Sequence, residues 1–211
     1  MEDNNLPTIH SSGTDHILWE GLDASKIKIW HIWEAIRDNR PVVPWYKAVW
    51  HRFQINRYAH FQWLTCLVGI STLARLHRFG ISSSQQCFLC ILGRETTTHL
   101  FLHCNYSKWI LHQLFDTIGI STMHESWNHF LVSLIDLEDK PKGTIALCYA
   151  QVFCYHLWRE RNARAHDRGV CGPSKLLQGI VLDIKARLGT SKWFNSVICN
   201  RPDLDLDKLW L

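Results

Sequence analysis

The chain has 211 residues, 46% hydrophobic and 20% charged, which is the composition of a folded protein of one or two domains. This composition excludes a largely disordered or low-complexity chain. The net charge is +4, but residues 51–115 hold six Lys and Arg residues against one Glu, a net charge of +5. Such a local positive charge is compatible with a nucleic-acid partner and also with an ordinary solvated surface.

The N-terminal sequence lacks the basic start and apolar stretch of a secretory signal, so we expect an intracellular protein that is not secreted. In a reducing compartment the eight Cys residues are not expected to form disulfides. The most apolar stretch, residues 144–158, is shorter than the roughly 20 residues that a membrane span needs. It also contains Gln151 and His156, so we expect a buried helix there and no membrane partner.

Apolar residues recur at spacings of three and four along most of the chain, which is typical of amphipathic helices. In chain order, the predicted helices cover residues 25–37, 44–53, 57–68, 72–79, 109–115, 125–135, 145–166 and 173–188. Gly69 and Gly80 are expected to end the helices before them, and Pro173 suits the first turn of the last one. Five tryptophans in these helical segments are expected in the core: Trp30, Trp33, Trp45, Trp50 and Trp63.

The best candidate for a linker is the charged stretch at residues 136–143, which contains a Pro and a Gly. The predicted organisation is therefore a polar N-terminal segment (1–18), a helical domain (19–135), this linker and a C-terminal helical region (144–211). Strand-like alternation is scarce, so the fold class is mainly α, with a short hairpin expected near a cluster of Cys residues.

That cluster is CFLCILGRETTTHLFLHC, in which Cys87, Cys90, His99 and Cys104 follow the pattern Cys-x2-Cys-x8-His-x4-Cys. A tight turn between two Cys separated by two residues brings both sulfurs to one metal. Three thiolates and one imidazole complete the tetrahedral set of a structural zinc site. Since this set leaves no coordination position open, we expect the metal to hold structure rather than to activate water.

On a continuous α-helix, His99 and Cys104 would lie about 140° apart. The helix is therefore expected to be short or distorted there, or the metal to lie at its end. His103 is the competing ligand, but it is adjacent to Cys104, and neighbouring side chains rarely point at one centre. This argument favours His99.

The pattern resembles the zinc-binding domain that follows the reverse transcriptase of plant LINE-type (non-LTR) retrotransposons. The resemblance covers roughly residues 14–168. Its carrying sequences are PWYKAVWH at 44–51, HFQWLTCLVGISTLARLHRFGI at 60–81, the Cys87–Cys104 cluster with Glu95 and Thr96, and LWRERNARAH at 157–166.

The resemblance implies that Cys87, Cys90, His99 and Cys104 hold one structural Zn²⁺ and that the module contacts RNA or DNA, with the nucleus as its place of action. The chain shows no Tyr/Phe-x-Asp-Asp polymerase motif, and no endonuclease or RNase H carboxylate set can be assembled from it. We therefore expect a non-catalytic module of a reverse transcriptase rather than an enzyme.

Five basic residues are candidates for contacts with phosphate. Arg94 and Lys108 flank the predicted zinc site, and Arg161, Arg164 and Arg168 share a helix face by their spacing of three and four. The alternative for the arginines is pairing with neighbouring acids or simple solvation.

Two further functions compete with nucleic-acid binding. In one, zinc only closes a helical fold whose apolar helix faces bind a protein partner or a second copy of the chain. In the other, zinc is catalytic. A catalytic zinc needs an open coordination position, and four protein ligands leave none.

Overall fold

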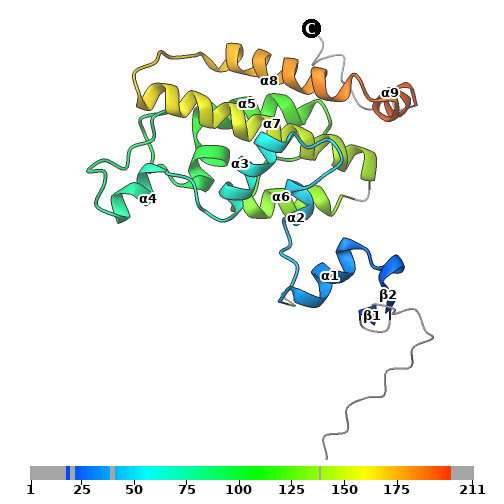
Figure 1. Ribbon diagram of the computed structural model, residues 1–211. Helices are drawn as coiled ribbons and strands as arrows, with labels where there is room; N and C mark the ends of the chain where they lie inside the picture. Colours follow the sequence, from blue (N-terminus) through cyan, green and yellow to red (C-terminus); the bar gives the residue numbers. More distant parts are fainter. Residues whose placement is uncertain (1–17, 20–21, 39–40, 138, 201–211) are drawn as a thin grey trace, which may run out of the picture. The chain divides into compact units, whose positions relative to one another are not determined.

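The computed structural model describes residues 18–19, 22–38, 41–137 and 139–200 (Figure 1). They fall into two units that divide between Val42 and Val43. The predicted polar segment at residues 1–18 lies almost wholly outside the described residues.

The described residues of the first unit form four short elements. These are an antiparallel pair of strands, β1 (Leu18–Trp19) and β2 (Leu22–Asp23), a 3₁₀ turn, η1 (Ala24–Lys26), and the helix α1 (Ile29–Ile36). None of the side chains of α1 is buried. Trp30 is 58% exposed and Trp33 is 60% exposed, so the expectation that they lie in the core was wrong. The spacing of apolar residues predicts that a helix has an apolar face. It does not predict whether another part of the protein packs against that face.

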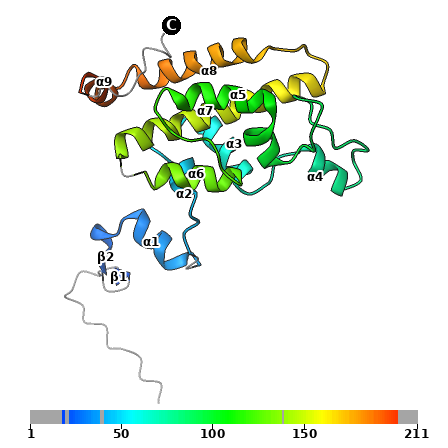
Figure 2. The same cartoon turned by 180° about the vertical axis from the view of Figure 1, so that it is seen from behind.

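The second unit is built from helices, and its longest connection, residues 79–98 between α4 and η2, contains Cys87 and Cys90. Its elements are α2 (Tyr46–Val49), α3 (Asn56–Cys66), α4 (Leu73–Arg78), the π-helical turn η2 (His99–His103), α5 (Asn105–Asp116), α6 (Trp127–Ile135), α7 (Lys140–Ala165), α8 (Pro173–Leu188) and α9 (Lys192–Cys199). Helix α7 packs against α3, α5, α6 and α8, while α4 and α9 lie at opposite ends of the unit (Figures 1 and 2). The predicted mainly helical fold class, built around the Cys-rich cluster, is confirmed.

The central helix α7 is buried on nearly all sides between Ile145 and Leu157, which explains its continuous apolar sequence. The Asp139 carboxylate accepts a hydrogen bond from the Lys142 amide, and Pro141 lies in the first turn. The helix therefore begins inside the 136–143 stretch that the sequence suggests as a linker. Among the described residues, no helix is long and apolar enough to cross a bilayer.

Aromatic side chains fill the space between α7 and its neighbours. Phe101, Phe115, Trp127, Phe130 and Phe153 are all buried and lie in ring-to-ring contact with one another. This packing supplies much of the apolar area that stabilises the second unit. It also anchors η2, the turn that carries one of the predicted zinc ligands, directly in the core.

Helix α2 is much shorter than the predicted 44–53. The buried amide side chain of Gln151 donates to the Val49 carbonyl at 3.2 Å and accepts from the Ile55 amide at 2.9 Å. It thereby satisfies backbone groups that a longer helix would pair internally. Trp50 is 50% exposed at the end of α2, so it too lies outside the core in which it was expected.

Candidate metal centre

A short hairpin presents the first two candidate ligands. Gln86 and Arg94 form an antiparallel bridge, and the Cys87 amide donates to the Gly93 carbonyl at 2.8 Å. At the tip, the Ile91 amide donates back to the Cys87 carbonyl at 2.8 Å, and Ile91 adopts a left-handed φ of 60°. The predicted hairpin at the Cys cluster is present, and its tight turn returns the chain beside Cys87.

A π-helical turn presents the other two candidate ligands. The Cys104 amide donates to the His99 carbonyl, five residues earlier, at 2.7 Å. This wider turn offsets the large angle that an α-helix would put between the two side chains. The hydroxyl of Thr96 accepts from the His99 amide at 3.0 Å and holds the start of the turn. The distortion expected from the five-residue spacing is thus a π turn.

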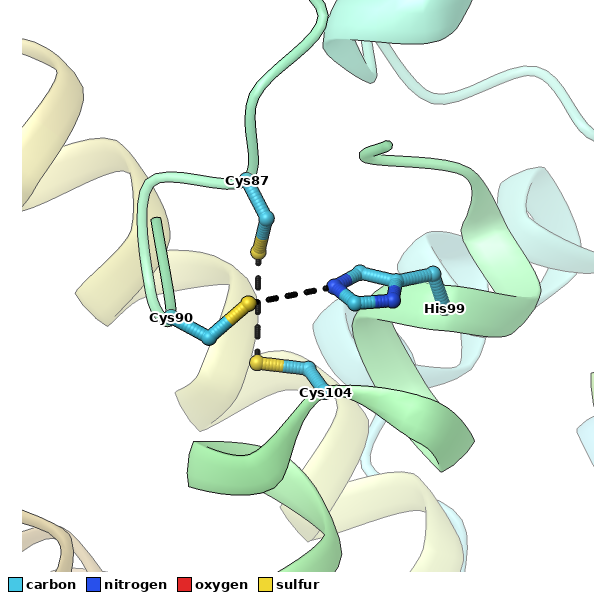
Figure 3. A group of neighbouring side chains, drawn as sticks. All are labelled: Cys87, Cys90, His99 and Cys104. Carbon is cyan, nitrogen blue, oxygen red and sulfur yellow. Dashed lines mark hydrogen bonds between the residues drawn. The ribbon is translucent and has the colours of Figure 1, made fainter. Parts of the chain in front are cut away.

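The four candidate side chains converge on one point (Figure 3). Their ligand atoms all lie within 4.8 Å of one another, with 3.9 Å between the sulfurs of Cys87 and Cys104. The Cys90 sulfur lies 3.3 Å from Nε2 of His99. Tetrahedral zinc with bonds of about 2.3 Å to sulfur and about 2.0 Å to nitrogen requires separations of roughly 3.5–3.8 Å. The separations of 3.9 Å and 3.3 Å lie close to this range, and the donor set of three sulfurs and one nitrogen fits Zn²⁺.

Backbone amides stabilise negative charge on the Cys87 sulfur. The amides of Leu89 and Cys90 donate to it from within the turn. The Cys87 thiol donates to the Cys104 sulfur, and this bond, with burial, raises the pKa of Cys87 above its ordinary value. Cys87 would have to lose this proton in order to hold zinc, because only the thiolate is a ligand.

Cys104 lies at the N-terminus of α5, where unpaired amides point at its sulfur. The bond from Cys87 is the largest cause that lowers the pKa of Cys104, and the His99 ring and the amides of Ser107 and Tyr106 lower it further. A thiolate is favoured at a helix N-terminus for this reason. These donors favour the thiolate form of Cys104, which is the form that binds a metal.

His103, the competing candidate, does not join the cluster. Its side chain is exposed, and its Nε2 lies 3.3 Å from the carbonyl oxygen of His124. The structure thus brings His99 rather than His103 to the three sulfurs.

The buried carboxylate of Glu95 is a structural centre that the sequence reasoning missed. It is fully buried and accepts from the Leu73 amide at 2.9 Å and from the Phe88 amide at 3.2 Å. It also pairs with Arg161, whose Nη2 lies 2.7 Å from Oε1. Glu95 is the sole acidic residue among residues 51–115, and this isolation is the one signal that could have pointed to it.

Two of the predicted phosphate contacts lie inside the protein. Arg161 is only 5% exposed and is engaged by Glu95, which leaves it no surface for a phosphate. Arg164 is half-buried and donates to Glu160, to the Leu89 carbonyl and to the Cys171 carbonyl. Their spacing of three along α7 therefore reflects contacts within the fold.

The other three predicted contacts are at the surface. Arg94, Lys108 and Arg168 are exposed, and none of them forms an ion pair with another described residue. Arg94 lies on the hairpin beside the candidate metal centre, and Lys108 on the first turn of α5. These three remain available to a charged partner.

Part of the chain is similar to a known protein family. Residues 28–110, less than half of the chain, match the family model described as zinc-binding in reverse transcriptase. Neither the curated proteins nor the solved structures contain a significant match to this chain. The matched segment contains Cys87, Cys90, His99 and Cys104, and the model describes a zinc-binding domain rather than a polymerase domain. The part of the chain that holds the candidate metal centre is therefore similar to the zinc-binding domain of reverse transcriptases.

Proposed function

We propose that the chain is a non-catalytic zinc-binding module, derived from the reverse transcriptase of a plant LINE-type retrotransposon, that contacts RNA or DNA. The observation that carries the proposal is the convergence of four zinc-type ligands within the segment that matches the family model. One structural zinc would link the hairpin, η2 and the start of α5. When bound, a closed Cys3His site supplies structure and has no free position for a substrate.

Exposed basic residues near the metal centre support the nucleic-acid part of the proposal. Arg94 and Lys108 are exposed and form no ion pair with another described residue, and Trp109, beside Lys108, is 41% exposed. Cations that neutralise phosphates and an aromatic ring on which a base can stack are the two components of single-strand recognition. The nucleus, as the place of such contacts, is part of the same proposal.

A second function is favoured by the apolar tip of the hairpin. Ile91 is 67% exposed and Leu92 is 81% exposed, next to the candidate zinc ligand Cys90. Large aliphatic side chains at a rigid loop tip are typical of protein contacts. In this alternative the zinc shapes a docking loop for a protein or a second copy of the chain.

The deciding experiment measures zinc content and nucleic-acid affinity on the same preparations. Wild type should hold one zinc per chain and bind single-stranded RNA or DNA with an affinity that falls as salt rises. In the double variant Arg94→Ala/Lys108→Ala, the slope of log affinity against log salt should become shallower by about 1.4, since two phosphate contacts to a single strand are lost. Fluorescence anisotropy of labelled oligonucleotides over a salt series provides the measurement.

The matched control removes two exposed lysines on other helices, Lys175 on α8 and Lys192 on α9, as Lys175→Ala/Lys192→Ala. It should keep the wild-type slope. If zinc-loaded wild type binds neither RNA nor DNA at low salt, this result would contradict the nucleic-acid proposal and favour the protein-contact alternative.

A further inference from the structure

The turn between the first two candidate ligands is held from outside by helix α7. Arg164 Nη1 donates to the Leu89 carbonyl at 3.0 Å. The Phe88 amide donates to the Glu95 carboxylate at 3.2 Å. Arg161 donates to the same carboxylate, from Nε at 3.0 Å and from Nη2 at 2.7 Å. Two arginines of α7 thus reach both of the residues that separate Cys87 from Cys90.

One of these contacts controls the orientation of an amide that faces the Cys87 sulfur. The Leu89 carbonyl belongs to the same peptide plane as the Cys90 amide, because a peptide unit is planar. That amide and the Leu89 amide both donate to the Cys87 sulfur. By holding the Leu89 carbonyl, Arg164 therefore points the Cys90 amide inward. Glu95 accepts from the Phe88 amide, which shares its peptide plane with the Cys87 carbonyl, so this contact fixes the backbone directly after Cys87.

Burial makes these contacts hard to replace by water. Glu95 is fully buried and Arg161 is 5% exposed, with its guanidinium 5.0 Å from the Phe88 ring and 4.9 Å from the Trp158 ring. Removing one partner of a buried ion pair leaves an uncompensated charge, so the remaining group must move or change protonation. Glu95 could then no longer hold the Phe88 amide in its present place.

Arg164 is fixed just as firmly. Its Nε lies 2.7 Å from Glu160, and its guanidinium carbon lies 4.6 Å from the centre of the Tyr106 ring. The Tyr106 amide is one of the two that donate to the Cys104 sulfur. Helix α7 therefore contacts both sulfur-bearing halves of the metal centre.

We propose that Arg161 and Arg164 are positioning residues for the zinc ligands, so the zinc-binding module extends from the family-matched segment into α7. Both residues lie more than 50 positions beyond the end of that segment, at residue 110. The inference rests on the proposed zinc binding. It assigns to these arginines a role toward the metal in place of the phosphate contacts that their spacing suggests.

The test compares three full-length variants: Arg161→Met, Arg164→Met and, as the control, Arg168→Met. The control removes an exposed arginine just beyond the end of α7. Zinc affinity is measured by competition with a chromophoric chelator. Residues that orient metal ligands typically change metal affinity by 10- to 100-fold, so each test variant should lose about that much, while Arg168→Met keeps the wild-type affinity.

Cobalt substitution separates positioning from general loss of stability. At saturating Co²⁺, the visible absorption bands report the ligand geometry. They should shift or weaken in Arg161→Met and Arg164→Met chains that still show the wild-type far-ultraviolet circular dichroism. Unchanged bands together with wild-type affinity in both folded variants would overturn the proposal.

A fourth variant, Arg161→Lys, covers the case in which Arg161→Met does not fold. Lysine keeps a cation against Glu95 but cannot donate twice in the fixed geometry of a guanidinium. Its zinc affinity should lie between that of wild type and that of Arg161→Met. If Arg161→Met cannot be measured, the affinity of Arg161→Lys should still be below that of wild type. Wild-type affinity in both Arg161→Lys and Arg164→Met would refute the inference. If the wild-type chain itself binds no zinc, the proposed function fails instead.

Discussion

At the scale of single residues, the closest approach in the metal centre is between Gly93 and His99. A Cβ atom at position 93 would lie 2.3 Å from Cε1 of the His99 ring and 2.9 Å from each ring nitrogen. These distances are below any that real Cβ atoms show, so one of the two segments must shift if position 93 carries a side chain. Gly93 is required because the His99 ring, on its way to the three sulfurs, occupies the space that a side chain at position 93 would fill.

We therefore predict that Gly93→Ala displaces the His99 ring and lowers zinc affinity about tenfold or more. Chelator competition on the full chain measures the effect. Gly172→Ala is the control, because nothing lies within 4 Å of the added methyl group there. Equal zinc affinity in the two variants would show that the hairpin moves aside without cost.

At the scale of elements, one carboxylate joins three helices. The Asp183 carboxylate on α8 accepts from the Tyr58 hydroxyl of α3 at 2.6 Å, and Nε2 of His156 on α7 lies 2.7 Å from the same oxygen. Burial by itself raises the pKa of Asp183, but the bonds from Tyr58 and His156 outweigh it, and the net pKa lies below the ordinary value. The ionised carboxylate thus helps to hold α8 on the α3–α7 pair.

A lowered carboxyl pKa adds stability above the unfolded pKa of about 3.9, and this stability is lost as the pH falls through the folded value. Asp183→Asn should therefore lower the thermal midpoint by about 2 to 4 °C at pH 7, a modest effect because the carboxylate is partly exposed. The difference from wild type should shrink as the pH approaches 3. Circular dichroism melts at several pH values test this, with the exposed Asp116→Asn as the control, and a constant difference would contradict it.

At the scale of the whole molecule, the candidate metal centre is continuous with the core of the second unit. Phe101 and Leu102, within η2, are buried among the same aromatic side chains that surround α7. Arg161 and Arg164 connect the hairpin to α7 itself. Loss of zinc should therefore destabilise the whole second unit and not only the hairpin.

Zinc at about 1,000 times its dissociation constant contributes about 4 kcal/mol to folding. For a unit of this size, that corresponds to roughly 8 to 16 °C in the thermal midpoint. We predict a fall of this order when excess chelator is added to the wild type. Cys104→Ser should melt near the chelated wild type and should not respond to chelator. A wild-type midpoint that chelator leaves unchanged would show that zinc does not hold the fold.

Local sequence was enough to predict what depends on near neighbours. The last predicted helix, residues 173–188, agrees with α8, because Pro173 starts it and the apolar periodicity runs unbroken to Leu188. The convergence of Cys87, Cys90, His99 and Cys104 also follows from the chain, since only 17 positions separate the first from the last and tight turns bring them together. Short loops leave few alternatives, so spacing alone carries this information.

The tertiary structure decided which surface each helix face meets. The sequence cannot tell that Trp33 is exposed while Trp127 is buried, because both lie in apolar helical stretches. It also could not pair Glu95 with Arg161, which are 66 positions apart. An arginine on a helix can pair equally well with a phosphate or with a buried carboxylate. Only the packing of α7 against the hairpin that carries Cys87 and Cys90 selects between these partners. The sequence by itself thus determined the mainly helical fold class and the cluster of zinc-type ligands, and the three-dimensional packing determined what holds that cluster in place.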